Sequence, residues 1–315
     1  APSIGGYCCI QCCRGSGHGP QCEQRRAPES APKAEPSWMP EDPNGKYQRA
    51  NLTHDDLRRD DEDWTQPRNQ EKADQRALVQ QMNIFIGPYL DYSERSAFDC
   101  IKLFKSAEHG WSLDYDPNLI CELLYEGFYT RGLEFAVRQP PVQVLVVSWD
   151  KKVSVWDFHE THISRQVRKR AKHCTMTVDT AFDDVLLGCV RMHGENWLFC
   201  GWRWMVRKLF SEGYTGKEDI RVSVHSFELW DKDSKLVAGD IGAFVGGVYT
   251  SMTGFHERHT RSLGEVQMVL TTALLHQLGF EWVDLGQVLP YKESLGARAV
   301  GRREYLERLH RDRDR

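Results

Sequence analysis

The sequence lacks any apolar run long enough to cross a membrane. No stretch of its 315 residues approaches the roughly 18 consecutive apolar residues of a transmembrane helix. The N-terminus also lacks the apolar segment of a secretory signal peptide, so we expect a soluble chain. The chain begins at Ala1 instead of Met, which indicates processing or a start other than the translated one.

An excess of positive charge is absent as well. The chain has 41 Lys and Arg against 45 Asp and Glu, a formal net charge of −4. Affinity for nucleic acid would therefore have to come from local basic patches. Hydrophobic residues make up 40% of the chain and aromatic residues 11%. This is enough for a core in one large domain or two modest ones.

Aliphatic residues are scarce between residues 14 and 75, where Pro, Arg, Glu, Asp, Gln and Asn dominate. Such a composition cannot bury enough apolar surface to offset the entropy lost on ordering. We therefore predict that residues 1–75 form a Cys-rich, polar extension that is disordered alone. We expect a partner surface to order this extension in a complex.

The cysteine pattern of the extension is incomplete as a metal site. Cys9 and Cys12 have the C-x-x-C spacing of zinc and iron–sulfur ligands, with His18 and Cys22 nearby. A structural zinc site usually has a second such pair, which is missing. Metal ligation is thus one alternative. Disulfides, lipidation and a flexible tail are the others. Five other cysteines stand singly in apolar sequence and are expected to be buried thiols: Cys100, Cys121, Cys174, Cys189 and Cys200.

Globular patterns begin at about residue 76. A period of 3.6 predicts helices over 77–90, 93–107, 116–128, 179–191, 201–214 and 265–279. Asp116 is expected as an N-cap with Pro117 in the first helical position, and Gly213 as a C′ residue. Alternation predicts strands over 141–149 and 152–158, joined as a hairpin around Asp150, and over 221–230, 236–251 and 281–289. This mixture predicts an α+β fold.

The segment from Phe158 to His173 is rich in histidine and basic residues. His159 and His162 lack the i, i+4 spacing that places two metal ligands on one helix face, and they stand at a strand-to-helix junction. This argues against a metal site. The basic side chains that follow suit either a nucleic-acid contact or a solvated helix face. They are Arg165, Arg168, Lys169, Arg170 and Lys172.

Five separated blocks, in order, resemble the bacterial leucyl/phenylalanyl-tRNA–protein transferase family. They lie at 114–129, 162–189, 196–198, 225–249 and 279–309, and include "HISRQVRKRAKHCTMTVDTAFDDVLLGC" and "HSFELWDKDSKLVAGDIGAFVGGVY". The resemblance implies a small mixed N-terminal domain over 76–180, including the basic helix. It also implies a GNAT (acyl-CoA N-acyltransferase)-like α+β domain over 181–315. The implied reaction moves Leu or Phe from charged tRNA to a protein's N-terminal amine, without a cofactor.

The resemblance also implies site residues. Asp284 matches the strand Asp that orients or activates the amine. Gln287 matches the family's Gln after a slip of one residue, because Gly286 fills the ungapped position. The implied aminoacyl pocket consists of Trp197, Phe128, Tyr129 and Ser148, with Val146 and Val147 replacing two tryptophans of the family. Besides the basic helix, the implied RNA contacts are Arg261, Arg298, Arg302 and Arg303. His256 stands where the family's loop has a Glu.

Two alternatives stay open. The motif losses and the extension favour a catalytically lapsed homologue that serves as a structural or RNA-binding subunit of a large organellar assembly, such as a mitochondrial ribosome or its assembly intermediate. Its partners would be tRNA or rRNA and, through residues 1–75, protein subunits, with no membrane contact. A mitochondrial or other organellar location is expected, with the cytoplasm as the alternative. An acyl-CoA N-acyltransferase is a minor alternative, because Glu265 and Val266 depart from the expected pyrophosphate-binding loop.

Overall fold

The computed structural model describes residues 52–64, 72–85, 87–92, 96–104, 107–135, 142–195, 197–216, 219–257 and 262–315. Within these ranges no helix is long and apolar enough to cross a membrane. The candidate residues that lie outside them are Cys9, Cys12, His18, Cys22 and Arg261. The proposed metal site and one proposed RNA contact therefore stay predictions.

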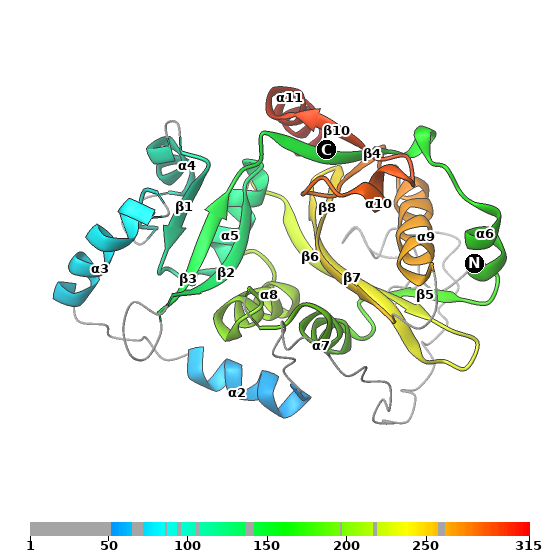
Figure 1. Ribbon diagram of the computed structural model, residues 1–315, viewed down its shortest axis with the longest axis horizontal. Coiled ribbons are helices and arrows are strands. Elements are labelled where there is room, and N and C mark those ends of the chain that lie inside the picture. Colours follow the sequence, from blue (N-terminus) through cyan, green and yellow to red (C-terminus); the bar gives the residue numbers. More distant parts are fainter. Residues whose placement is uncertain are drawn as a thin grey trace.

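Two sheets organise the described chain (Figure 1). A three-stranded antiparallel sheet has the order β1 (His109–Ser112), β3 (Val142–Ser148) and β2 (Tyr129–Phe135). A seven-stranded sheet has the order β10 (Arg298–Gly301), β4 (Lys152–Asp157), β9 (Trp282–Asp284), β8 (Val248–His256), β7 (Leu236–Val245), β6 (Val222–Trp230) and β5 (Thr175–Val178).

In the larger sheet only β8 and β9 run parallel, and α9 (Leu263–Gln277) connects them. Figure 1 shows α9 on one face of this sheet and α7 (Phe182–His193) and α8 (Cys200–Glu212) on the other. The apolar core that covers the larger sheet divides accordingly into two layers. The predicted α+β class is confirmed.

The other helices lie around the two sheets. They are α2 (His54–Trp64), α3 (Lys72–Phe85), α4 (Ala97–Ile101), the 3-10 turn η1 (Lys102–Phe104), α5 (Pro117–Tyr125), the 3-10 turn η2 (Phe158–Glu160), α6 (Arg165–Ala171), α10 (Pro290–Glu293) and α11 (Arg302–Asp312). Helix starts follow the sequence closely where a cap is present. The Asp116 carboxylate accepts from the Asn118 amide at 2.8 Å, with Pro117 in the first turn, as predicted. Gly213, with φ of +76°, follows α8 as predicted.

Two strand predictions are wrong. The strands on either side of Asp150 form no hairpin, because β3 pairs with β1 and β2 whereas β4 pairs with β9 and β10. Each strand is interior to its own sheet, so other strands already occupy both of its edges. The predicted strand 236–251 is two strands, β7 and β8, that turn at Gly246 and Gly247. Gly246 has a φ of +54°, which favours glycine.

Sheet membership divides the chain near residue 150. β4 and β5, which fall in the N-terminal domain predicted over 76–180, belong to the larger sheet, and α6 packs on α9. β4 joins this sheet because it lies between β9 and β10, which come from the C-terminal end. The expectation that these elements belong with the small domain is therefore corrected.

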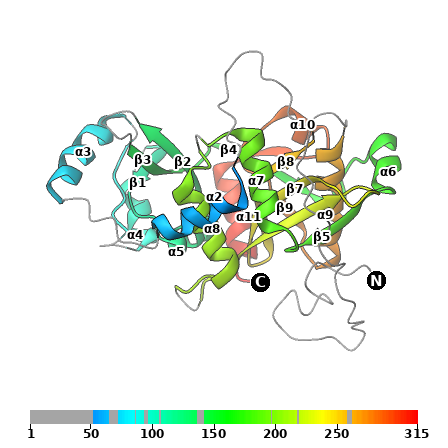
Figure 2. The same ribbon diagram turned by 90° about the horizontal axis from the view of Figure 1, so that it is seen from below.

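Part of the polar extension is ordered by the chain itself. α2 packs along α8 (Figure 2), with Leu57 fully buried. The Asp60 carboxylate accepts from the Arg203 guanidinium at 2.7 and 3.0 Å. Residues 54–64 therefore need no separate partner, because one leucine and matched charges secure them to α8. This corrects the predicted disorder over those residues.

Candidate active site

Asp284, at the end of β9, is fully buried and accepts hydrogen bonds from four donors. Oδ1 accepts from the Gly286 amide at 2.8 Å and from the Tyr129 hydroxyl at 3.1 Å. Oδ2 accepts from the Tyr305 hydroxyl at 2.8 Å and from Thr250 Oγ1 at 3.3 Å. A carboxylate has about four lone-pair positions, so these donors use its full capacity.

The donors come from elements that meet at one place. Thr250 lies on β8, Tyr305 on α11 and Tyr129 on β2 of the smaller sheet, so the site forms where the two sheets meet. β8 and β9 pair only at Tyr249–Val283 and Thr250–Asp284. After Asp284 the chain bonds to β4, where the Leu285 amide donates to the Ser154 carbonyl at 2.9 Å.

Gly286 makes this turn possible. Its φ of +65° lies in the left-handed region, which strains residues other than glycine, and its amide thereby reaches Asp284. Gln287 has an exposed side chain, and its carbonyl accepts from Lys292 Nζ at 2.9 Å. The group that contacts Asp284 is thus the backbone amide of Gly286, whereas the side chain of Gln287 lies on the surface.

Burial sets the electrostatics of the site. It raises the pKa of Asp284 above its ordinary value, although the hydrogen bonds oppose this shift. Burial also raises the pKa values of Tyr129 and Tyr305 well above the ordinary value, which keeps both hydroxyls protonated as donors. Burial lowers the pKa of Lys292, whose ammonium donates to the Leu285 carbonyl at 2.5 Å. The arrangement can therefore hold and move a proton away from water.

Arg302 lies among aromatic rings next to this site. Its guanidinium carbon is 5.0 Å from the ring centre of Phe128, 5.6 Å from Trp149 and 5.4 Å from Tyr305. It also donates to the Gly127 carbonyl at 2.5 Å. Burial lowers its pKa. This side chain, which the sequence suggested as an RNA contact, links α11 to the end of α5.

The four residues of the implied aminoacyl pocket divide into two places. Phe128, Tyr129 and Ser148 lie together, since Tyr129 and Ser148 are opposite each other in the β2–β3 pair. Trp197 packs instead against His193 and Trp202, each with ring centres 5.8 Å apart. Among the described residues, no hydrogen bond or ring contact connects Trp197 to the Asp284 cluster.

The basic residues of α6 lie on the surface. Arg165, Arg168, Lys169 and Lys172 are exposed and Arg170 is half-buried, while Val167 turns inward against the α9 layer. No carboxylate in the described part of the chain lies within ion-pair distance of these five cations. The Arg303 side chain is 93% exposed, with Glu307 at 3.4 Å. α6 therefore presents unpaired positive charge to solvent.

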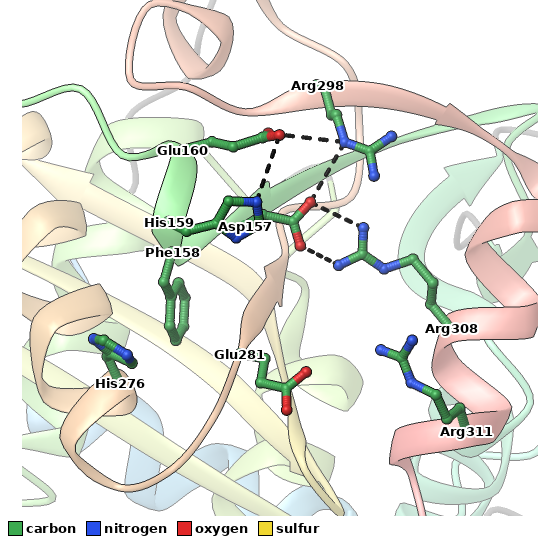
Figure 3. Close-up of a pocket in the computed structure, with 9 residues that line it drawn as sticks. All are labelled: Asp157, Phe158, His159, Glu160, His276, Glu281, Arg298, Arg308 and Arg311. Atoms are coloured by element: carbon green, nitrogen blue, oxygen red, sulfur yellow. Dashed lines mark hydrogen bonds and ion pairs between the residues drawn. The ribbon is translucent and has the colours of Figure 1, made fainter.

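A separate open pocket of about 560 Å³ lies at the other end of β9 (Figure 3). Its lining comprises Asp157, Phe158, His159, Glu160, His276, Glu281, Arg298, Arg308 and Arg311. Arg308 donates to Asp157 from both terminal nitrogens, and Arg298 ion-pairs with Asp157, Glu160 and Glu304. Its three arginines face three carboxylates, so the pocket has no clear excess of either charge. Arg298 is thus held within this network.

Sequence reasoning missed two partners of Asp284. Tyr305 and Thr250 were not singled out, and Tyr129 was assigned to the aminoacyl pocket instead of the carboxylate. Tyr305 stands in the block at 279–309, so its place in the matched motif was the available signal. Tyr129 also stands in a matched block, at 114–129, but nothing in that block indicates its contact with a carboxylate in the other sheet.

The described chain thus combines an α+β fold with a buried carboxylate at the junction of its two sheets. Residues 155–310 match the family described as "Leucyl/phenylalanyl-tRNA protein transferase". Over these residues the chain is similar to that family, as its motifs indicated. Asp284, Thr250, Tyr305 and α6 fall inside the matched range, whereas Tyr129 and α2 precede it.

Curated proteins with the same description match part of the chain. A leucyl/phenylalanyl-tRNA–protein transferase of Shewanella sediminis is 31% identical over 143 residues, covering 44% of this chain and 56% of the relative. Another, from Desulfatibacillum aliphaticivorans, is 29% identical over 155 residues, covering 47% and 61%. The chain therefore spans somewhat more than half the length of these relatives.

Solved structures are more distant. The C-terminal domain of a putative lysylphosphatidylglycerol synthetase from Agrobacterium fabrum is 13% identical, with a TM-score of 0.31, covering 70% of this chain and 67% of that one. A GCN5-related N-acetyltransferase from Kribbella flavida is 12% identical, with a TM-score of 0.30, covering 68% and 74%.

Proposed function

We propose that this chain is an aminoacyl-tRNA–protein transferase, which moves Leu or Phe from charged tRNA to the N-terminal amine of a protein. The observation that supports this most is the buried Asp284 with its two phenol donors. It sits where the paired strands β8 and β9 separate, within the region that matches the family. A group that handles protons is what the attack of an amine on an ester requires.

The chemistry needs little beyond positioning and proton transfer. The amine nitrogen attacks the ester carbonyl carbon, a C–N bond forms, and the C–O bond to the tRNA breaks. The amine loses one proton, and the leaving hydroxyl of the tRNA gains one. Since the ester is already activated, the step needs neither ATP nor a metal ion.

Tyr129 is the donor best placed to take part. Its hydroxyl is shared between both Asp284 oxygens, at 3.1 and 3.2 Å, and its side chain is only half-buried. In the proposed step the phenol oxygen accepts the proton of the amine while its own proton moves to Asp284. The raised pKa of Asp284 favours this acceptance. Tyr305 and the Gly286 amide hold the carboxylate in place.

The exposed face of α6 is proposed to bind the tRNA backbone. Its cations would contact phosphates without reading sequence. The acceptor protein would present its N-terminal amine to the Asp284 site. These partners follow from the proposed reaction.

The test is transfer of labelled Leu or Phe from charged tRNA to a peptide with an N-terminal Arg. Asp284→Asn should lower the rate by about 100-fold or more, because general base catalysis contributes ~10²–10⁴-fold. Tyr129→Phe should also lower it. A matched control is Tyr125→Phe, which removes a phenol on α5 that donates to Asp314 at 2.5 Å and should leave the rate unchanged. Equal rates for all variants would refute the role of Asp284.

A second candidate is a catalytically lapsed homologue that binds RNA as a subunit of a large organellar assembly. The full occupation of Asp284 by four donors and the exposed Gln287 favour it. Binding of charged tRNA without transfer, together with rRNA or ribosomal proteins that copurify, would replace the transferase proposal with this one. Cell fractionation would test the organellar location. The acyl-CoA alternative predicts a thermal shift with acetyl-CoA.

A further inference from the structure

A Ser–His–Asp cluster lies apart from the Asp284 site, with Ser223 and His225 on β6 and Asp179 directly after β5. Ser223 Oγ lies 2.8 Å from His225 Nε2, and His225 Nδ1 lies 2.7 Å from Asp179 Oδ2. Ser223 and His225 are two residues apart on one strand, so their side chains share a face. The His225 and Asp179 side chains are each 9% exposed, while Ser223 is half-buried.

Backbone hydrogen bonds hold Asp179 in an uncommon backbone conformation. Its φ of +58° is uncommon for a residue other than glycine. The Asp179 amide donates to the Ser226 carbonyl at 3.0 Å, and the Ser226 amide donates to Asp179 Oδ1 at 2.9 Å. One carboxylate oxygen is thus fixed by the backbone, and the other is presented to His225.

These contacts determine the state of the imidazole. The carboxylate can only accept, so Nδ1 carries the hydrogen when the ring is neutral, and the Nε2 lone pair faces Ser223 Oγ. A serine hydroxyl, an imidazole and an orienting carboxylate in this order form the arrangement that activates a nucleophile.

Apolar rings lie beside the cluster. The ring centre of Phe244 is 4.4 Å from that of His225, and Phe280 is 5.1 Å from Phe244. In the described chain, β5 pairs with β6 only over Val178–Phe227 to Thr175–Trp230, so the part of β6 that carries Ser223 lacks a strand on that side. The rings of Phe244 and Phe280 therefore give an apolar acyl group a surface to pack against.

We propose that Ser223 is an activated nucleophile that takes an acyl group from an oxygen ester. Ser223 Oγ attacks the carbonyl carbon and gives its proton to His225 Nε2. The C–O bond of the ester breaks, and the alcohol leaves with that proton. Water then releases the acid and regenerates Ser223, with His225 again as the base. Ser223 and His225 are the catalytic residues, and Asp179 is a positioning residue.

The cluster is independent of Asp284. Tyr249 belongs to the α9 layer with Phe227 and Val283, whereas its neighbour Thr250 donates to Asp284. Successive residues of a strand point to opposite faces. His225 contacts Phe244 and thus lies toward the α9 layer, so the serine site and Asp284 occupy opposite faces of the sheet.

The experiment treats the full chain with a fluorophosphonate probe and maps the labelled peptide by mass spectrometry. The label is expected on Ser223, and hydrolysis of p-nitrophenyl butyrate should depend on the same residue. Ser223→Ala should abolish both. Asp179→Asn should lower the labelling rate by about 100-fold or more. It should also change how that rate depends on pH, which a merely structural role would not do.

Two variants serve as controls for the role of Ser223. Ser251→Ala removes a half-buried serine that bonds a carboxylate, Asp240, at 2.8 Å instead of an imidazole, and should leave labelling unchanged. Asp284→Asn should lower aminoacyl transfer by about 100-fold or more, whereas labelling of Ser223 on the opposite face should continue. Label on residues other than Ser223, or equal rates for wild type and Asp179→Asn at all pH values, would overturn the proposal. Mapping the labelled residue in the wild-type chain tests the proposal even where a variant fails to fold.

Discussion

Asp240 on β7 is a buried acid whose hydrogen-bond partners among the described residues are neutral. It accepts from the Tyr249 hydroxyl at 2.5 Å and from Ser251 Oγ at 2.8 Å. Burial raises its pKa from 3.8 to about 6, against the effect of these bonds. The folded protein therefore binds a proton here at a pH at which the unfolded chain has already released it.

This shift predicts how stability depends on pH. Between about pH 4 and pH 6 the folded state holds more protons at Asp240, so this residue's contribution to the free energy of unfolding falls as pH rises. The loss amounts to about 3 kcal/mol in all, at 1.36 kcal/mol per pKa unit. Asp240→Asn should remove this pH-dependent loss of stability. The variant should therefore become more stable relative to wild type as pH rises to 7. Urea unfolding at several pH values measures the difference.

The control for this prediction is Asp233→Asn, a change in the exposed turn between β6 and β7, where the side chain is 71% exposed. Its free energy of unfolding should follow that of wild type at every pH. A wild-type minus Asp240→Asn difference that stays constant from pH 4 to pH 7 would contradict the role assigned to burial.

At the scale of elements, success of prediction depended on whether the signal was local. α5 and α8 were predictable because Asp116, Pro117 and Gly213 fix their ends through bonds within a few residues. The partners of β3 and β4 were not, because two strands adjacent in sequence join different sheets. α2 was missed for a similar reason. Its sequence is polar, and the arginines that secure it lie on α8.

The candidate site follows the same rule. Asp284 was identified from its place in a recognisable block. Its contact with Tyr129 joins residues 155 positions apart, which no local pattern records. Arg302 was assigned to RNA because basic residues are usually exposed, whereas here the rings of Phe128, Trp149 and Tyr305 surround it. Composition cannot distinguish these two environments.

The attachment of α2 gives a prediction about stability. The Arg203 side chain is 3% exposed, and it donates to Asp60, to Glu195 at 2.9 Å and to the Leu198 carbonyl. Asp60→Ala leaves two donor nitrogens of this buried cation without Asp60, with Glu195 as the remaining carboxylate, and should cost about 1–3 kcal/mol of unfolding free energy. The double variant Asp60→Ala, Arg203→Met should recover part of that loss. Denaturant unfolding of the four members of this cycle measures the coupling.

An exposed pair on the same helix serves as the comparison. Arg58 and Asp55 are 68% and 69% exposed, so Arg58→Ala should change stability by less than about 1 kcal/mol. If Asp60→Ala were equally mild, α2 would not be secured by the buried pair, and its packing on α8 would have to depend on Leu57.

At the scale of the whole molecule, a chain of net charge −4 can bind RNA only through a localised surface. The exposed cations of α6 form such a surface. Replacing Arg165, Arg168, Lys169 and Lys172 with Gln should weaken tRNA binding and reduce its dependence on salt. Each lost phosphate contact should lower the slope of log K against log salt by about 0.7–0.9. Filter binding at several salt concentrations measures both effects.

The matched control removes the same charge elsewhere. Changing Arg58, Arg59, Lys102 and Lys208 to Gln also removes four positive charges, but each of these cations is already paired with a carboxylate on α2, α4 or α8. Because both variants have the same net charge, long-range repulsion of RNA is equal in the two. Only the α6 variant should lose salt dependence. An equal loss in both would show that binding responds to total charge, and α6 would then be an ordinary solvated helix.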